Sequence, residues 1–261
     1  MKYKGYQQLL LPPLTLFIII IVLWQYISSR ALIGFWVIPS PQSVINVFMD
    51  YPHLIWMHLK PTLIASISGL LLAFLLGLAT ALAMHACPLV KRTLYPYLII
   101  SQTIPIIAVA PVLVLWFGFG IAAKIFTVIL VSFFPIALGF YDGLRQVNQE
   151  QILLLRSMGA NTWETYRLLY IPASLPSLFT GLKLAATYSV MGAVIGEWLG
   201  GNAGLGIYMT RATKSFQTAH VFAVILVIVV LSMSLFGIVA LLDRLLLAWY
   251  YKKEAEYKDI K

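Results

Sequence analysis

The side chains of this sequence that could take part in chemistry are few and widely separated. Asp142, Glu197 and Asp243 are the acidic residues near long apolar runs, and each lies close to the end of its run. An enzyme working within a membrane would need paired carboxylates, a nucleophile with its base, or a set of metal ligands. The sequence has neither the G-x-S-x-G nor the H-E-x-x-H motif. It therefore favours a protein that is not an enzyme and has no catalytic residues.

Metal and nucleotide sites are not indicated either. His53 and His58 are five residues apart, a spacing that does not place two ligands on one helix face. The segment "GFGIAAK" at residues 118–124 lacks the G-x-x-x-x-G-K-[ST] spacing of a phosphate-binding loop. We therefore expect this chain to bind no metal and no cofactor of its own.

Glu197 is the most informative of the acidic residues. A carboxylate near an apolar run is costly in lipid unless it faces water or a partner. Glu197 is therefore expected to line a pathway, to pair with Arg211 or Lys214, or to receive another protein. The remaining alternative is a solvated carboxylate at the membrane interface.

A row of glycines surrounds this carboxylate. Gly192, Gly196 and Gly200 recur every fourth residue and so share one helix face. Such rows allow two helices to approach closely. The row predicts a sliding or dimer contact beside a pathway, and the alternative is packing against another helix of the same subunit. Tyr188, on the same run, is expected to face a cavity.

The elements that hold these residues must be membrane helices. Hydrophobic residues make up 61% of the 261 residues and charged residues 10%, against about 45–50% and 25% in soluble domains. So few charges cannot cover a soluble globule. The high hydrophobic content excludes disorder, and a disulfide scaffold is excluded because Cys87 is the only cysteine. The net charge of +9 is spread between apolar runs, so it does not form a nucleic-acid surface.

Six apolar runs approach the length of about 20 residues that crosses a bilayer. They cover residues 10–28, 62–84, 94–117, 125–140, 175–199 and 221–249. Solid runs of this kind do not suit a barrel, whose strands alternate. Pro105 and Pro111 are expected to bend the third run. The sequence thus predicts an all-α integral membrane protein with about six transmembrane helices.

Orientation follows from the positive charges in short loops. With the N-terminus in the cytoplasm, twelve of the eighteen Lys and Arg residues fall in inner segments and five, including Lys124, in outer ones. Both termini are therefore expected in the cytoplasm. The expected organisation is an uncleaved anchor helix (1–28), an outer loop (29–61), a core of five spans (62–249) that includes the loop 142–176, and a cytoplasmic tail (250–261).

Two segments outside the spans are expected to be ordered. In the outer loop, Pro39 and Pro41 favour an extended stretch, after which Ser43 is expected to cap a short amphipathic helix on the membrane. In the inner loop, residues 148–158 predict a helix that ends at Gly159, where a positive φ would be cheap only for glycine.

A second helix of the 142–176 loop is expected to begin at Asn161 or Thr162, with Glu164 in its first turn. One interpretation is that this helix–glycine–helix unit outside the bilayer is a docking surface for a soluble partner. The alternative is an ordinary connecting loop lying on the lipid surface.

The stretch "LLLRSMGANTWETYRLLYIPASLP" at residues 153–176 resembles the cytoplasmic loop of permease subunits in binding-protein-dependent ABC importers. The family pattern is Glu-Ala-Ala, three residues, Gly, nine residues, Ile, one residue, Leu-Pro. Gly159 and Pro172 fall at the family spacing, while Leu153, Leu154 and Leu155 replace Glu-Ala-Ala.

Three further segments are similar to the nitrate, sulfonate and taurine branch of this family. They are "IPSPQSVINVF", "PIIAVAPVLVLWFGFG" and "GEWLGGNAGLGIYMTRATKSFQTAHVFA". Together with the inner loop they extend the resemblance over nearly the whole chain. The last segment also resembles permeases for thiamine pyrimidine precursors.

The resemblance implies a bacterial inner-membrane importer. Two permease subunits, here expected as a homodimer, form the pathway for a solute that a substrate-binding protein delivers. ATP and magnesium belong to partner ATPase subunits, which accept a coupling helix at about residues 153–165. The implied coupling residues are Leu153, Leu154, Leu155, Arg156, Met158, Gly159, Ala160, Thr162 and Glu164. The residues expected in the pathway or in helix packing are Tyr188, Gly192, Gly196, Glu197, Gly200, Pro105 and Pro111.

The resemblance identifies the transport mechanism more closely than the transported solute. The resemblance favours a thiamine pyrimidine precursor, with a sulfonate, taurine or nitrate as the alternative. An intramembrane enzyme and an ion-coupled secondary transporter are more distant alternatives, since no buried carboxylate at mid-membrane and no internal repeat is evident.

Overall fold

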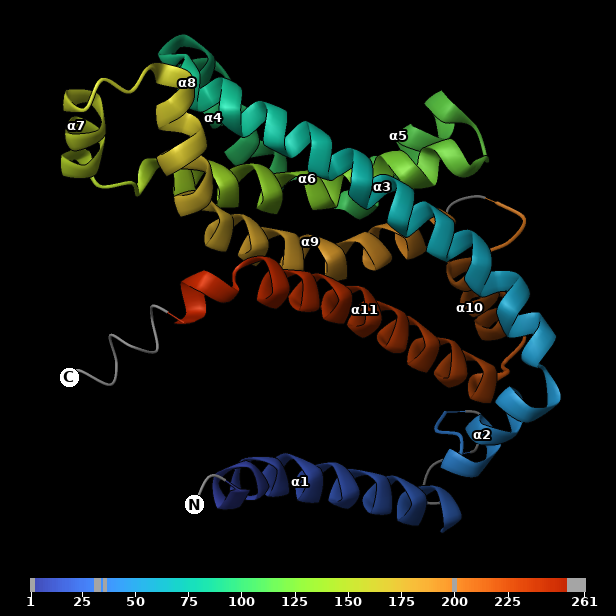
Figure 1. Ribbon diagram of the computed structural model, residues 1–261. Coiled ribbons are helices and arrows are strands. Elements are labelled where there is room, and N and C mark those ends of the chain that lie inside the picture. Colours follow the sequence, from blue (N-terminus) through green and yellow to red (C-terminus); the bar gives the residue numbers. More distant parts are fainter. Residues whose placement is uncertain (1–2, 31–33, 35–36, 199–200, 253–261) are drawn as a thin grey trace.

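The computed structural model describes residues 3–30, 34, 37–198 and 201–252, and every regular element in this part of the chain is helical (Figure 1). The elements are α1 (Tyr3–Ser29), α2 (Pro41–Asp50), α3 (Pro52–Ala86), α4 (Pro88–Thr103), α5 (Ile106–Phe117), α6 (Ile121–Arg145), α7 (Gln149–Ser157), α8 (Thr162–Thr165), the π-helical turn η1 (Tyr166–Tyr170), α9 (Ile171–Trp198), α10 (Leu205–Lys214) and α11 (Thr218–Leu246). The predicted all-α class is confirmed.

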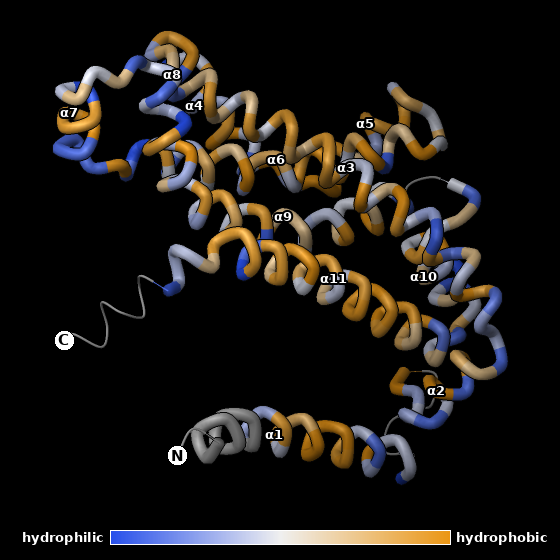
Figure 2. The backbone as a smooth tube through the Cα atoms, viewed as in Figure 1, coloured by the Kyte–Doolittle hydropathy of each residue, from blue (hydrophilic) through white to orange (hydrophobic). Residues whose placement is uncertain are grey.

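In the part of the chain that the structure describes, five helical stretches are long and apolar enough to cross a membrane by themselves. They are Pro12–Ser29, Pro52–Ala86, Ile121–Arg145, Thr162–Trp198 and Thr218–Leu246. Apolar residues dominate α11 most plainly, while hydrophilic residues gather around α7 and α8 at one end of the stack and around α2 and α10 at the other (Figure 2). This distribution fits a bundle whose two ends face water.

The third expected span is broken rather than gently bent. The helices α4 and α5 meet at an angle of 104°. Pro105 has no N–H to continue α4, and Ile104 before it is extended, with φ −82° and ψ 118°. The Ala108 N–H then bonds to the Pro105 carbonyl and starts α5. Pro111 lies inside α5 and does not end it.

The centre of the bundle is α6, which packs between α3 and α9 (Figure 1). Small residues make these contacts close. A Cβ on Gly69 of α3 would lie 2.5 Å from Val128 Cβ of α6. A Cβ on Gly181 of α9 would overlap the Pro135 carbonyl of α6. On the other side of α9 lies α11, held by apolar residues such as Val190 and Leu235.

The first helix stands apart from this stack (Figure 1). Large apolar side chains on α1, such as Leu16 and Phe17, are exposed. The indole Nε1 of Trp24 donates to the Pro39 carbonyl at 2.8 Å and ties α1 to the segment before α2. The apolar side chains of α1 therefore face lipid or another protein.

Several helix boundaries differ from the sequence predictions: α6 and α11 each begin three or four residues earlier than expected, and three further differences have a clear cause. Helix α2 begins at Pro41 and is capped by Ser40, not Ser43, because the Ser40 hydroxyl accepts the Ser43 N–H at 3.1 Å and Pro41 suits the first helical position. Helix α3 begins at Pro52, so residues 52–61 of the expected outer loop are helical. The fifth span begins before residue 175, because helix runs on from Thr162 through Pro172 and Pro176.

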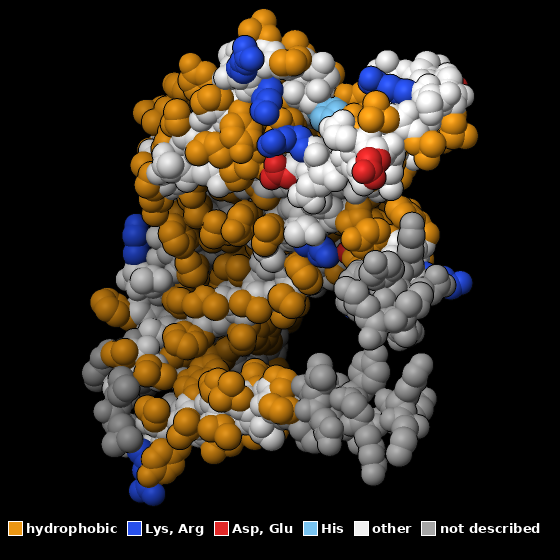
Figure 3. Space-filling model, turned by 90° about the vertical axis from the view of Figure 1, so that its left-hand side faces the viewer, with side chains coloured by type: hydrophobic (Ala, Val, Ile, Leu, Met, Phe, Trp, Pro, Cys, Tyr) orange, Lys and Arg blue, Asp and Glu red, His pale blue; other side chains and the backbone are white. Residues whose placement is uncertain are grey.

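The ends of the stack differ in composition. The helices α7 and α8, the start of α1 and the end of α11 lie at one end (Figure 1). Figure 3 faces this end and shows Lys and Arg side chains gathered on it. The turn between α5 and α6 lies at the opposite end, with α2 and α10 (Figure 1).

Candidate functional site

The 142–176 loop forms two helices joined by a tight turn. Asn148 caps α7 by accepting the Glu150 N–H at 2.9 Å. Gly159 ends the helix with φ +89°, which confirms the predicted left-handed turn. The Gly159 N–H bonds to the Arg156 carbonyl and the Ala160 N–H to the Leu155 carbonyl, the paired bonds of a Schellman motif. The coupling segment at about residues 153–165 therefore consists of two helices that meet at Gly159, as the helix–glycine–helix prediction has it.

A reciprocal cap starts the second helix. Asn161, rather than Thr162, is the N-cap of α8, and its side chain accepts the Glu164 N–H at 2.9 Å. The Glu164 carboxylate in turn accepts the Asn161 N–H at 2.7 Å. This capping box fixes the direction in which the chain leaves the turn. Glu164, implied as a contact to a partner, is thus engaged within its own helix.

Large apolar side chains project from these two helices into solvent. Leu153, Leu154 and Met158 are exposed, and so is Trp163, 70% of which is accessible. Leu155 and Ala160 are half-buried, while Arg156 and Thr162 are exposed. Trp163 was not predicted from the sequence. The signal was present, since tryptophan is enriched at protein interfaces and Trp163 lies in a segment expected outside the bilayer.

The loop is fastened to α3 by an aromatic contact. His85 Nδ1, near the end of α3, lies 2.6 Å from the Tyr166 hydroxyl of η1. The Tyr170 ring meets the His85 ring edge-on, with centroids 4.7 Å apart. Since α8, η1 and α9 form one continuous helix, the loop is joined directly to α9 and through His85 to α3.

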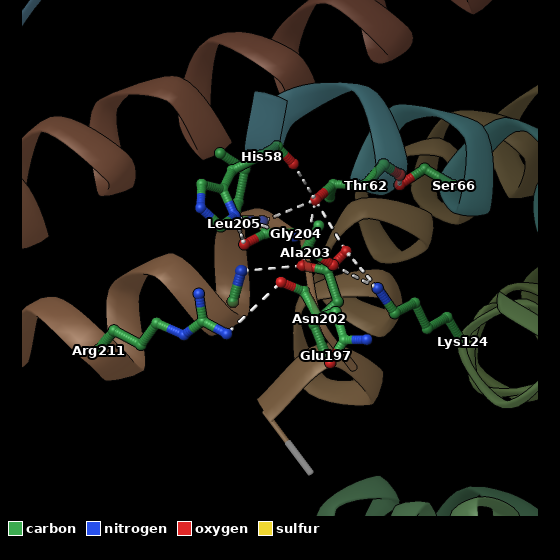
Figure 4. Close-up of polar contacts among 11 residues, drawn as sticks. His58, Thr62, Ser66, Lys124, Glu197, Asn202, Ala203, Gly204, Leu205 and Arg211 are labelled. Atoms are coloured by element: carbon green, nitrogen blue, oxygen red, sulfur yellow. Dashed lines mark hydrogen bonds and ion pairs between the residues drawn. The ribbon is translucent and has the colours of Figure 1, made fainter. Parts of the chain in front are cut away.

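A buried polar cluster surrounds Glu197 at the other end of the bundle (Figure 4). The Glu197 side chain is 0% exposed, and Lys124 Nζ of α6 lies 3.5 Å from Oε1. Thr62 Oγ1 of α3 donates to Oε1 at 2.8 Å, and the Gly206 N–H donates to Oε2 at 2.8 Å. We call His58, Thr62, Lys124, Glu197 and Gly204 the Glu197 cluster.

The cluster also holds the segment that leads into α10. Lys124 Nζ donates to the Ala203 carbonyl at 2.7 Å, and the Leu205 N–H donates to Thr62 Oγ1 at 2.9 Å. His58 Nδ1 lies 3.1 Å from the Gly204 amide nitrogen. Gly204 has φ +140°, and a Cβ there would overlap the Glu197 carboxylate.

These contacts decide between the alternatives for Glu197. The prediction of a solvated carboxylate is wrong, because the Glu197 side chain is 0% exposed. The prediction of an ion pair with Arg211 or Lys214 is also wrong, because the cation beside Glu197 is Lys124. Arg211 instead reaches the Asn202 carbonyl at 3.5 Å (Figure 4). Lys124, expected in an outer loop, is buried in the first turn of α6. The sequence could have indicated this, since an ionisable residue such as Lys124 next to an apolar run needs a partner.

The glycine row packs within the subunit. A Cβ on Gly192 would lie 2.7 Å from Val131 Cγ2, and one on Gly196 would lie 3.1 Å from Lys124 Cα. Both neighbours belong to α6 of the same subunit. These glycines therefore pack within the subunit, which was the alternative to a sliding or dimer contact. Gly200 lies outside the described residues.

Tyr208 and His220 form a second contact between helices near this end. The Tyr208 hydroxyl of α10 lies 2.6 Å from His220 Nδ1 of α11. Burial, with a smaller contribution from Tyr51, raises the pKa of the Tyr208 hydroxyl. The Tyr208 hydroxyl therefore keeps its proton and stays neutral.

A cavity of about 700 Å³ opens where α4 breaks from α5. Its walls come from α3, α4, α5, α6 and α9. Of the residues expected in the pathway, Pro105 and Tyr188 line it. Pro111, Gly192, Gly196 and Glu197 are not among its lining residues. Gln102 and Ser101, which the sequence reasoning missed, bring polar groups to the wall.

Comparison with protein families identifies one matching domain. Residues 69–247 match the model of the "binding-protein-dependent transport system inner membrane component". The match begins within α3 and ends just after α11, so it contains the 142–176 loop, the Glu197 side chain and the cavity.

Curated relatives match almost end to end. The chain is 38% identical over 251 residues to the formylaminopyrimidine transport permease protein ThiX of Halalkalibacterium halodurans, covering 96% of this chain and 99% of the relative. It is 29% identical over 250 residues to the putative aliphatic sulfonates transport permease protein SsuC of Bacillus subtilis, covering 95% and 89%.

A solved structure shares the fold. An amino acid ABC transporter with histidines superimposes with a TM-score of 0.63 at 17% identity, over 76% of this chain and 97% of the transporter chain.

Proposed function

Since the chain belongs to the family of inner membrane components of binding-protein-dependent transport systems, and is thus the permease subunit of an ABC importer, we propose that it imports an aminopyrimidine. The observation that carries this proposal is the similarity to the formylaminopyrimidine permease, at 38% identity over 99% of that relative. The sulfonate permease is similar over a comparable length at only 29%. A thiamine pyrimidine precursor is therefore the leading solute, with a sulfonate, taurine or nitrate as the alternative.

The chain is a transport component rather than an enzyme. An importer permease works with ATPase subunits and a substrate-binding protein. ATP and magnesium are proposed to reside on the ATPase, and a second copy of this chain is proposed to complete the pathway. We expect lipid around the bundle and no nucleic acid among the partners.

The 142–176 loop is the proposed docking site for the ATPase. Its exposed Leu153, Leu154, Met158 and Trp163 offer apolar area to a groove in a soluble partner. Gly159 and Ala160 form a small tip between them, and Arg156 lies on the rim. An exposed rim contact contributes about 0–1 kcal/mol, so the apolar side chains supply most of the binding.

Alternating access follows from this docking. ATP binding closes the two ATPase subunits and displaces the loops they hold. The continuous helix from α8 to α9 and the His85–Tyr166 contact pass the displacement to α9 and α3. The pathway then opens toward the loaded binding protein, and hydrolysis resets it, so two global states alternate.

The protein is a multi-pass inner membrane protein, and we propose that both termini face the cytoplasm. The α7 end of the bundle carries gathered Lys and Arg side chains (Figure 3). Cytoplasmic ends of membrane proteins are enriched in these residues. The ATPase also requires the 142–176 loop on that side.

Uptake by the purified importer tests the solute. The permease, its ATPase and its binding protein are reconstituted in liposomes with ATP inside, and radiolabelled formylaminopyrimidine or taurine is added outside. We expect ATP-dependent uptake of formylaminopyrimidine. Uptake of taurine alone would reverse the choice of solute, and uptake of either compound without ATPase would contradict the importer mechanism.

A further inference from the structure

The cavity at the break between α4 and α5 lies deep in the membrane-spanning part of the bundle. Leu130, Val131, Phe133 and Phe134, which line it, come from the middle of α6. A broken helix is tolerated at such depth only where its backbone is buried in protein or lines a cavity. The Ser101 and Thr103 hydroxyls donate to the Leu98 and Ile100 carbonyls, which satisfies two acceptors near the end of α4. Broken helices of this kind commonly line solute sites in transporters.

The size and walls of the cavity suit a small ring. Cavities of about 300–1,000 Å³ are typical for small molecules, and this one measures about 700 Å³. Tyr97, Phe133, Phe134 and Tyr188 supply aromatic faces and edges. Aromatic side chains hold flat rings by offset or edge-to-face contact. The walls therefore favour a planar, unsaturated solute over a compact tetrahedral anion.

The polar groups on the walls are uncharged. Among the described lining residues they are Thr80, Tyr97, Ser101, Gln102 and Tyr188, with no Lys, Arg, His, Asp or Glu. A sulfonate bound there would have no cation among the described lining residues to balance its charge.

Nearby apolar helices do not supply a free cation. Lys124 is paired with Glu197 at 3.5 Å, and Lys183 of α9 is paired with Asp243 of α11 at 2.9 Å. In the described part of the chain, neither lysine is available to hold an anion in the cavity.

We propose that this cavity is a binding site for a planar, uncharged aminopyrimidine in transit through the membrane, with Gln102 as the residue that recognises its polar edge. The inference rests on the proposed function and adds the place where the solute is held. An amide carbonyl accepts from an exocyclic amino group while the amide NH₂ donates to the adjacent ring nitrogen, as Gln does with adenine. Tyr188 covers a face of the ring.

The site gives the solute a favourable position when the binding protein releases it. Without the amide, the polar edge of the ring lacks its partners in the site, and the solute returns to the outside before the pathway closes. Loss of Gln102 therefore affects how much solute enters per ATP. It does not affect how the binding protein or the ATPase docks.

The test compares Gln102→Leu with Gln25→Leu, a matched change on the exposed surface of α1. The complete importer is reconstituted, and uptake of formylaminopyrimidine and ATP hydrolysis are measured together. We expect Gln102→Leu to lower the solute imported per ATP about tenfold, while hydrolysis stimulated by the loaded binding protein stays unchanged. Gln25→Leu is expected to match the wild type. A wild-type ratio in Gln102→Leu would overturn the site and leave the proposed function standing.

A labelling experiment gives a readout that does not depend on the amide. In a Cys87→Ser background, Ser101→Cys is exposed to a small uncharged maleimide during ATP turnover with the binding protein present. Protection by formylaminopyrimidine and not by taurine supports the site. Equal labelling with and without formylaminopyrimidine, in an importer that still transports it, would overturn the site. Transport of taurine instead of formylaminopyrimidine by the wild type would refute the proposed function before any variant is needed.

Discussion

At the scale of single residues, the Lys124–Glu197 pair joins four elements through two charged side chains. Glu197 lies on α9, Lys124 on α6 and Thr62 on α3, and the backbone before and within α10 completes the set. A buried ion pair of this kind adds little net stability over apolar packing, but losing one partner is costly. Its main effect is to fix where α10 sits against the bundle.

Replacing Lys124 tests this account. Lys124→Met leaves the buried Glu197 charge without its cation, and we expect it to cost about 3–5 kcal/mol of stability. The double variant Lys124→Met/Glu197→Gln is expected to recover part of this loss, and Lys214→Met, at an exposed position, to change nothing. Thermal unfolding of the purified permease measures all three. Equal stability of Lys124→Met and the wild type would contradict the role of the pair.

Gly159 allows a second residue-scale prediction. Its φ of +89° is strained for any other residue, yet a Cβ there would meet no atom within 4 Å. Gly159→Val is therefore expected to distort the turn, by about 1–3 kcal/mol of strain, without a clash. Co-purification of the ATPase is expected to fall while membrane insertion is unchanged.

Gly118 provides the matched control for that variant. It has φ +75° and the same free space, but lies in the turn between α5 and α6. Gly118→Val is expected to keep the ATPase bound. Wild-type ATPase retention and transport in Gly159→Val would contradict docking at the 142–176 loop.

At the scale of elements, the π-helical turn η1 connects the loop to the membrane. It ends at Tyr170, two residues before Pro172, and its wider turn accommodates a residue that cannot donate its N–H to the helix. The helix therefore continues where an ordinary α-helix would tend to kink. Because of this continuity and the His85–Tyr166 contact, α8 is rigidly connected to α9 and α3.

Two tyrosine–histidine contacts of equal length allow a test of whether the His85–Tyr166 contact transmits movement or only packs. Tyr166 contacts His85 at 2.6 Å at the α7 end, and Tyr208 contacts His220 at 2.6 Å at the other end. Tyr166→Phe is expected to raise the ATP hydrolysed per solute imported several-fold, because α3 no longer follows the loop. Tyr208→Phe is expected to leave this ratio close to that of the wild type. Similar ratios in the two variants would show that the His85 contact is only structural.

The sequence predicts the helices whose position depends only on local residues. Solid apolar runs located the spans, and Asn161, Glu164 and Gly159 marked the ends of helices in the loop. The boundaries at Pro52 and Ile104 could not be predicted, since they depend on contacts between distant helices and on the angle at a proline. Lys124 was misplaced for the same reason, because its partner is 73 residues away.

At the scale of the whole molecule, the arrangement of both ends of the bundle predicts its orientation. In a Cys87→Ser background, Ser157→Cys of α7 and Asn202→Cys before α10 mark the two ends. A membrane-impermeant maleimide is expected to label position 202 in intact cells and position 157 only after permeabilisation. The reverse pattern would place the termini and the 142–176 loop outside the cell and contradict the importer assembly.

The exposed tip of the 142–176 loop also bears on how cells must make this protein. Met158 is 77% exposed and Trp163 70%, on a surface that would face water until an ATPase covers it. A subunit inserted without its partner would offer this apolar tip to chaperones, proteases and other orphan subunits. We therefore expect balanced synthesis of permease and ATPase to matter for the survival of the permease, as well as for its activity.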